Sequence, residues 1–159
     1  MRPSVKHFAS AGALAAAVLL GGTQDAAAQQ EDLPAIVSLR KALMVSNQQH
    51  VRALGALLSG ELNMPLHILR HAEVMEYNGQ MLSQLFPEGS TNPASRATDR
   101  IWDDGEGFAA RVQAFADATR DLNRVAQRGF NDQTAEALAT VRATCAACHQ
   151  AYRGPAPAD

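Results

Sequence analysis

The fold is decided by residues 33–58, which read LPAIVSLRKALMVSNQQHVRALGALL. Apolar side chains recur in this stretch every seven residues, at Val37, Met44, Val51 and Leu58. Seven residues make about two turns of an α-helix, so these side chains share one face. They predict an amphipathic helix from about Asp32 to Ser59, with Pro34 in its first turn.

Three further helices show the same kind of apolar spacing, and they are expected over residues 63–86, 99–127 and 132–153. Asn63 is the expected cap of the first of these, and Asn131 or Asp132 that of the last. Gly79 weakens the middle of the second helix of the chain. Residues that favour strands are sparse. Four helices joined mostly by short loops predict an all-α fold, an antiparallel four-helix bundle.

The first 28 residues have the composition of an export signal. Arg2 and Lys6 give a basic start, an apolar run covers residues 11–20, and Ala26-Ala27-Ala28 offers a cleavage site. The apolar run is only about half of the roughly 20 residues that cross a bilayer, which argues against a membrane anchor. No later segment is apolar enough to span one. We therefore expect residues 1–28 to be removed, residues 29–159 to form one domain, and the protein to be periplasmic.

The charge of the mature chain argues against two classes of partner. Without Arg2, Lys6 and Asp25 the chain has 12 basic and 15 acidic side chains, a formal net charge of −3. This charge is too small and too dispersed to indicate binding to nucleic acid or to an anionic membrane.

Both cysteines of the chain stand in the run Cys145-Ala146-Ala147-Cys148-His149. Cys-x-x-Cys-His is the pattern of c-type haem attachment. On a helix these three side chains share one face, so two thiols can form thioethers with the porphyrin while His149 reaches the iron from the same side. Two alternatives are open. A redox dithiol normally accompanies a βαβ pattern, which is not evident, and a structural zinc site needs further ligands at a recognised spacing.

The chain resembles the class II cytochromes c, which include cytochrome c′ and the low-spin cytochrome c-556 group. The resemblance rests on the C-terminal position of the Cys-x-x-Cys-His box and residues 150–153 after it, on Leu39-Arg40-Lys41-Ala42-Leu43-Met44, and on Ile101-Trp102. It covers residues 32–153 and implies a four-helix bundle with one covalently bound haem c.

Met44 separates two functions within that resemblance. Low-spin members place a methionine of the first helix on the iron, whereas cytochromes c′ leave this position open behind an apolar side chain. The run Leu43-Met44-Val45-Ser46-Asn47 looks closer to cytochrome c-556. We therefore expect a periplasmic one-electron carrier, and no enzyme, in which His149 and Met44 both ligate the iron. The alternative is a cytochrome c′-like protein in which Met44 only fills space and the open iron binds NO or CO.

Two arginines belong to the expected haem environment. Arg40 lies one turn from Met44, where its guanidinium could neutralise a haem propionate, although a solvated arginine is the plainer interpretation. Arg153 lies one turn beyond His149 and could cover the proximal haem face, as its family counterpart does, or simply complement the helix dipole. The expected partners are redox proteins, and the resemblance also suggests a homodimer formed through the first two helices.

Three other histidines have no role in that site. His67 and His71 stand four residues apart and could hold a metal ion on the surface, but no third ligand is evident. His50 falls on the more polar side of the first helix, where solvation is expected.

Overall fold

The computed structural model describes the backbone of residues 21–91, 95–129 and 131–155, and side chains from Leu33 onward. The chain divides into two units, Met1–Asp32 and Leu33–Asp159. Of the first unit, a helical backbone from Gly21 is described. The predicted export signal, residues 1–28, falls largely outside the described residues, so it stays a prediction.

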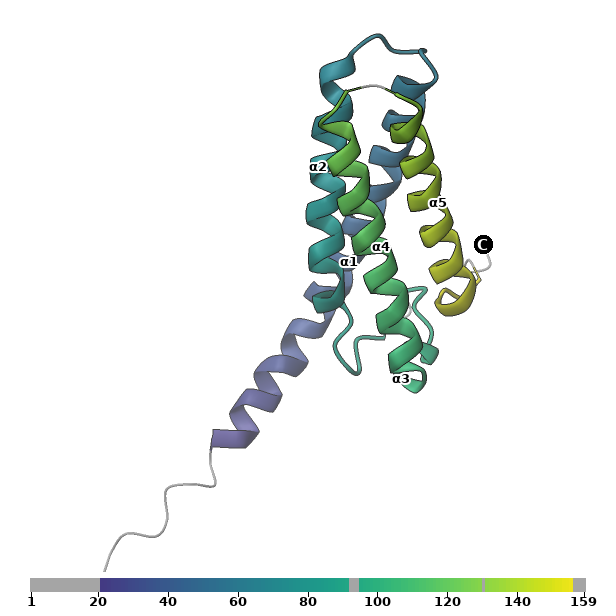
Figure 1. Ribbon diagram of the computed structural model, residues 1–159. Coiled ribbons are helices and arrows are strands. Elements are labelled where there is room, and N and C mark those ends of the chain that lie inside the picture. Colours follow the sequence, from purple (N-terminus) through teal and green to yellow (C-terminus); the bar gives the residue numbers. More distant parts are fainter. Residues whose placement is uncertain (1–20, 92–94, 130, 156–159) are drawn as a thin grey trace, which may run out of the picture. The chain divides into compact units, whose positions relative to one another are not determined.

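The second unit is built on four long helices (Figure 1). The last part of α1 (Gly21–Leu58) is followed by α2 (Pro65–Met81), which the short 3-10 helix η1 (Leu82–Leu85) extends. One helical turn, α3 (Arg100–Asp103), precedes α4 (Gly105–Ala126), and α5 (Asp132–Tyr152) completes the bundle. The predicted all-α antiparallel four-helix bundle is confirmed. In the part of the chain that the structure describes, β pairing is limited to one isolated bridge, between Ala97 and Arg153.

Three helix ends differ from those that the sequence predicts. α2 begins after Met64 instead of Asn63, and Pro65 takes its first position, where the missing N–H costs nothing. Asp104 interrupts the expected third helix, and its carboxylate caps α4 by accepting a hydrogen bond from the Gly107 N–H. α1 begins at Gly21, because the alanine-rich residues before Pro34 also favour a helix, so this proline lies inside α1.

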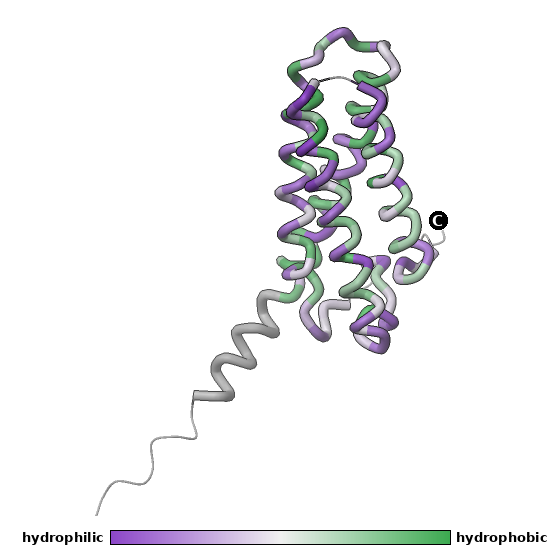
Figure 2. Tube along the Cα trace, in the orientation of Figure 1, coloured by the Kyte–Doolittle hydropathy of each residue, from purple (hydrophilic) through white to green (hydrophobic). Residues whose placement is uncertain are grey.

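The core lies between the helices of the second unit and contains the predicted apolar faces. Its buried members are Leu43, Leu54, Leu57, Ile68, Ala72, Met75, Leu82, Leu85, Val112, Phe115, Ala118, Leu122, Val125, Ala126, Ala137, Leu138 and Val141. α4 packs against both α2 and α5. Figure 2 shows hydrophobic and hydrophilic residues alternating along the helices, as expected for helices that each bury one face.

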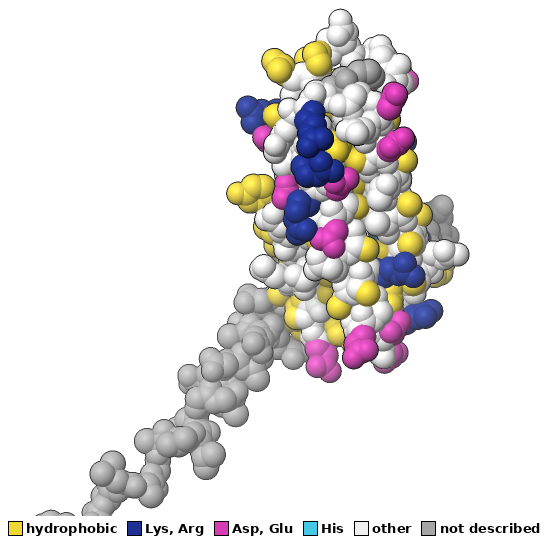
Figure 3. All heavy atoms as spheres, in the orientation of Figure 1, with side chains coloured by type: hydrophobic (Ala, Val, Ile, Leu, Met, Phe, Trp, Pro, Cys, Tyr) yellow, Lys and Arg dark blue, Asp and Glu magenta, His cyan; other side chains and the backbone are white. Residues whose placement is uncertain are grey.

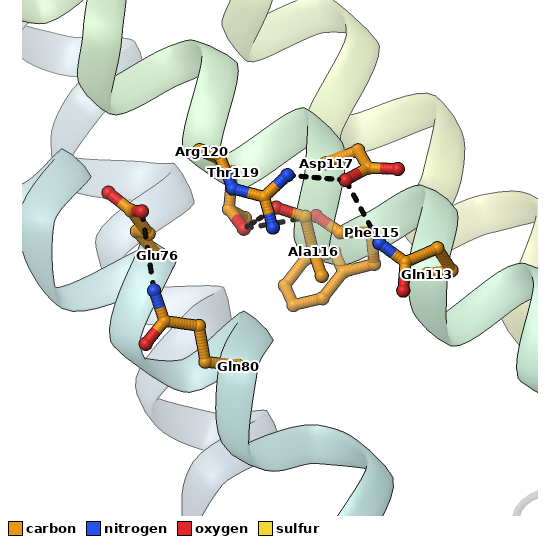
Figure 4. A network of polar contacts seen from close by, with 8 residues as sticks. All are labelled: Glu76, Gln80, Gln113, Phe115, Ala116, Asp117, Thr119 and Arg120. Atoms are coloured by element: carbon orange, nitrogen blue, oxygen red, sulfur yellow. Dashed lines mark hydrogen bonds and ion pairs between the residues drawn. The ribbon is translucent and has the colours of Figure 1, made fainter.

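α2 and α4 approach each other closely at Gly79. A Cβ atom at this position would lie 2.5 Å from Thr119 Oγ1 and 3.2 Å from the Cα atom of Ala116. The Thr119 hydroxyl is buried and lies 3.0 Å from the carbonyl oxygens of both Phe115 and Ala116 (Figure 4). The glycine that weakens α2 in the sequence is therefore needed by the packing of the two helices.

The outer face of α4 carries ion pairs between residues one turn apart. Arg120 lies 2.6 Å from Asp117, and Arg124 pairs with Asp121. Figure 3 shows basic and acidic side chains interspersed over this side of the molecule. Exposed pairs of this kind contribute little to stability. Among the described residues, none of the helices combines the length and the apolar character that crossing a membrane requires.

Candidate functional site

A cavity of about 510 Å³ lies among α1, α4, α5 and the segment that joins η1 to α3. This volume falls within the range of roughly 300–1,000 Å³ that ligand and cofactor sites occupy. The lining includes every residue that the sequence singles out for the haem site: Arg40, Met44, Cys145, Cys148, His149 and Arg153. Residues more than 100 positions apart in the sequence thus meet at one cavity.

α5 presents the cysteine–histidine motif to this cavity. The helix begins at a side-chain cap, because Asn131 Oδ1 accepts a hydrogen bond of 3.1 Å from the Thr134 N–H. Of the two caps predicted for this helix, Asn131 and Asp132, the structure confirms Asn131. Cys145 and Cys148 are free thiols and are both half-buried, and a spacing of three residues puts them one turn apart on the helix.

Burial controls the ionisation of the motif. It raises the pKa of the Cys145 thiol, and the neighbouring Cys148 adds to this effect. Burial also raises the pKa of Cys148, although Arg111 acts in the opposite direction. Burial, together with nearby arginine side chains, lowers the pKa of His149, which keeps its imidazole neutral. Neutral imidazole is the form that ligates a metal ion.

Arg40 enters the cavity from α1 as a buried cation. Only 4% of its surface is exposed, and Nη2 donates a hydrogen bond of 2.6 Å to the Ser90 carbonyl oxygen. The guanidinium carbon lies 4.5 Å from the centre of the Phe86 ring. Burial lowers the pKa of Arg40, and its Nε is buried without a hydrogen-bond partner. The prediction that places Arg40 at the site fits this geometry, while the alternative of a solvated arginine does not.

Met44 lies on the α1 side of the cavity and Arg153 at the end of α5. Met44 is half-buried and packs against the hydrophobic core as well as lining the cavity. Arg153 is exposed and is the C-cap residue of α5. Both residues are thus near the motif, on the elements that the sequence predicts.

Arg96 and Tyr152 also belong to the site, although no sequence pattern indicated a role for Arg96. The Arg96 guanidinium donates two hydrogen bonds to the Gly154 carbonyl oxygen, at 2.9 Å from Nε and 2.6 Å from Nη2. The Tyr152 hydroxyl donates a hydrogen bond of 2.8 Å to Asp104. These contacts fix the C-terminal end of α5, and with it His149, against the segment that precedes α4.

The charge of the cavity lining is one-sided. Among the described residues, the lining contains no carboxylate but six basic side chains, those of Arg40, Lys41, Arg96, Arg111, Arg142 and Arg153. The whole chain has a formal net charge of −2, so this concentration of positive charge is local. An apolar cavity edged by cations fits a flat apolar group that carries carboxylates.

A protein-family model described as Cytochrome C′ matches residues 35–153. The chain belongs to the cytochrome c′ family. It is 32% identical to cytochrome c′ of Pararhodospirillum photometricum over 120 residues, which cover 75% of this chain and 96% of that protein. It is 29% identical to cytochrome c′ of Rhodospirillum rubrum over 138 residues, which cover 86% of this chain and 94% of that protein.

Solved cytochrome c′ structures have the same fold. The nitric oxide complex of a variant cytochrome c prime from Alcaligenes xylosoxidans is 26% identical, with a TM-score of 0.72 over 77% of this chain and 97% of that one. Cytochrome c prime from Shewanella frigidimarina is 21% identical, with a TM-score of 0.73 over 79% of this chain and 98% of that one.

This cytochrome c′ family member carries covalently bound haem c, as its family does. The site fits such a group on its own geometry. It offers the only two thiols of the chain on one wall of a cavity, and the buried Arg40 Nε lacks the acceptor that a propionate would provide.

The comparisons contradict the predicted electron carrier. The chain is a class II cytochrome c, but its matches are to cytochrome c′, and the expected closeness to cytochrome c-556 is not supported. The prediction of one-electron transfer with His149/Met44 ligation is therefore wrong. The prediction failed at Met44, because a methionine that ligates the iron and a methionine that only packs in the core both point toward the inside of the bundle. Heptad spacing alone does not separate the two roles.

Proposed function

We propose that this cytochrome c′ family member binds nitric oxide or carbon monoxide at a five-coordinate haem iron. The family match across residues 35–153 is the observation that carries the proposal. Solved structures similar to this chain include nitric oxide complexes of cytochrome c prime variants from Alcaligenes xylosoxidans. Binding to redox partner proteins and the absence of enzymatic activity are predictions from the sequence.

The α5 motif is proposed to hold the haem. Cys145 and Cys148 supply the two thioether sulfurs, and the Nε2 atom of His149 ligates the iron from the α5 side. When bound, the haem supplies an iron centre that takes up a diatomic gas. The Asn131 cap and the Arg96 contacts support this role, because they fix both ends of the helix that carries the motif.

Arg40 is proposed to neutralise a haem propionate. Its other guanidinium nitrogens already reach Ser90, at 2.6 Å and 3.3 Å, so Nε is the donor that needs an acceptor. A buried cation without a counter-ion is costly, and a carboxylate at this point removes that cost. Arg153 is proposed to lie over the haem on the side of His149, which its place at the end of α5 supports.

Met44 is proposed to cover the distal side of the haem as an apolar side chain. It lines the cavity from α1, whereas His149 lines it from α5. A side chain that fills this space without ligating the iron leaves one coordination position for a gas and keeps larger ligands out. The role of Met44 is therefore steric.

Optical spectra of the haem-loaded protein test this proposal directly. We expect broad high-spin bands in the ferric and dithionite-reduced protein and a marked change on adding carbon monoxide. Met44→Leu is the matched variant, because leucine keeps the apolar volume and removes the sulfur. It should leave the spectrum and the carbon monoxide response unchanged. Sharp split ferrous bands that ignore carbon monoxide, and that Met44→Leu converts to high-spin bands, would contradict the proposal.

The protein is further proposed to be periplasmic, with residues 1–28 removed after export. The basic start, short apolar run and Ala26-Ala27-Ala28 support this. N-terminal sequencing of the haem-loaded protein isolated from periplasmic extract should begin at Gln29. A mature protein that keeps residues 1–28 would contradict the cleavage.

A homodimer through α1 and α2 is also proposed. α2 exposes Leu66, Val74, Tyr77 and Met81, whose spacings of eight, three and four residues place them along one face. Light scattering on the eluted protein should give twice the chain mass, and Tyr77→Lys should reduce it to the monomer value. A monomer at high concentration would contradict this proposal.

A further inference from the structure

Three histidines outside the haem site come together on α1 and α2. His50 was expected to be solvated, but it is half-buried, and its Nδ1 lies 2.7 Å from Nδ1 of His71. The centres of these two rings are 5.0 Å apart. His67 lies one turn before His71, with its ring centre 6.3 Å from that of His71. Histidines 21 residues apart in the sequence are thus in direct contact, and neither belongs to the cavity lining.

The contact between the two Nδ1 atoms requires that at least one of the two rings is neutral. A distance of 2.7 Å is a hydrogen bond in which one Nδ1 donates its hydrogen and the other accepts with its lone pair. Burial lowers the pKa of His50. Burial, with smaller effects of His50 and His67, lowers the pKa of His71. Both rings are therefore neutral near pH 7. Both Nδ1 lone pairs become available to a metal ion once the donating ring changes its tautomer.

We infer that His50 and His71 form a binding site for a divalent transition-metal ion such as Zn²⁺, which joins α1 to α2 through the two Nδ1 atoms. Zinc binds imidazole nitrogen at about 2.0–2.1 Å, so tetrahedral ligands stand roughly 3.3 Å apart. The present separation of 2.7 Å has to open by about 0.6 Å, which small rotations of two half-buried rings supply. The ring that carries its hydrogen on Nδ1 moves it to Nε2, so binding releases no net proton.

The pair across the two helices is a better site than the pair along α2. His67 and His71 have the spacing of a chelating pair, but their rings are farther apart and His67 is exposed. Among the described residues, no three histidine, cysteine or carboxylate side chains converge on one point. Water is therefore assigned to the remaining zinc positions.

Zinc titration of the haem-loaded mature protein, without an affinity tag, tests the inference. In that protein the other histidine, His149, is taken up by the haem site. Isothermal titration with zinc chloride should show one strong site per chain. His50→Gln and His71→Gln should each weaken it by at least about tenfold, since the loss of even an indirect partner of a ligand costs that much.

His67→Gln is the matched control, because it makes the same substitution one turn away on α2. It should bind zinc as the unaltered protein does. Absence of zinc binding, or equal binding by the His50→Gln variant, would overturn the inference. Loss of binding in His67→Gln with retention in His50→Gln would also overturn it, since the metal would then be held along α2. Circular dichroism and the haem spectrum of each variant verify that it is folded.

The mass of the protein during the titration separates a site within one chain from a bridge between two chains. Sedimentation of the Tyr77→Lys variant, which is expected to be monomeric, should give the same mass with and without zinc, because both ligands are on one chain. A zinc-dependent increase in mass that His50→Gln abolishes would overturn the assignment to a site within one chain.

Discussion

Replacing Gly79 with alanine tests the contact between α2 and α4 (Figure 4). The added methyl group would meet Thr119 Oγ1 at 2.5 Å and the Ala116 Cα atom at 3.2 Å. Thr119 is fully buried, and its hydroxyl lies 3.0 Å from two helix carbonyl oxygens. Rotation of the buried Thr119 side chain would give up these hydrogen bonds, and the close contact with the Ala116 backbone would remain. The clash therefore has to be relieved by moving the two helices apart.

Two opposing contributions set the size of the effect. Alanine is favoured over glycine inside a helix by about 1 kcal/mol, while overpacking costs about 1–3 kcal/mol. A distance of 2.5 Å is far shorter than van der Waals contact, so we take the upper end of the overpacking range, about 3 kcal/mol. Gly79→Ala should then lower the free energy of unfolding by about 2 kcal/mol. In a Thr119→Ala background the shortest contact is gone. The same substitution should then be within about 1 kcal/mol of neutral.

Guanidinium denaturation of the haem-loaded protein, followed by circular dichroism, measures these values for the two single variants and the double variant. We expect a coupling energy of about 2 kcal/mol between positions 79 and 119. Gly105→Ala is the control, because no heavy atom lies within 4 Å of its added methyl group. It should stabilise the protein by up to about 1 kcal/mol. An equal effect of Gly79→Ala in both backgrounds would refute the packing argument.

Three further predictions concern pH, helix α5 and the cavity. Burial lowers the pKa of His50 and His71 below 6.5, so as the pH falls these side chains are protonated in the unfolded chain before they are in the folded one. The metal-free protein should therefore lose stability below about pH 6.5. The His50→Gln/His71→Gln double variant should lose less stability in the same denaturation series. Asn131→Ala removes the cap of α5 and should cost about 1 kcal/mol in urea denaturation while leaving the haem spectrum unchanged. Arg40→Gln should lower the haem reduction potential more than Arg153→Gln does, because Arg40 is buried and Arg153 is screened by water. Spectroelectrochemistry measures both potentials, and equal shifts would contradict this prediction.

Features that depend on short sequence patterns could be predicted from the sequence. Contacts between residues far apart in the chain could not. The heptad residues Met44, Val51 and Leu58 are half-buried and pack against the core, so heptad spacing indicated the inward side of α1. The spacing of Cys145, Cys148 and His149 was enough to locate the motif. Arg96 was missed, because its partner Gly154 is 58 residues away and no local pattern marks a side chain that bonds a distant carbonyl oxygen. The contact of His50 was missed for the same reason.

Helix boundaries and the role of Met44 failed for other reasons. Asn63 and Met64 are adjacent, and the fixed backbone of Pro65 decides where α2 begins. Asp104 breaks the expected third helix because two glycines follow it closely, at positions 105 and 107. Glycines destabilise a helix interior, so a new helix that begins at an Asp104 cap is more stable than one continuous helix. For Met44, packing and ligation demand the same inward direction, so only the family match decided against ligation.

The charge at Arg40 connects the cavity to the stability of the fold. Arg40 is a buried residue, and among the described residues the partners of its guanidinium are neutral: the Ser90 carbonyl and hydroxyl and the face of the Phe86 ring. Burying a charge in this way is unfavourable, as the lowered pKa of Arg40 also indicates. The chain keeps this cation at the edge of the cavity although an apolar side chain would pack at lower cost. Its placement is understandable if the carboxylates of the covalently bound haem complete the pair, and the cofactor is then part of the folded core as well as the proposed site of gas binding.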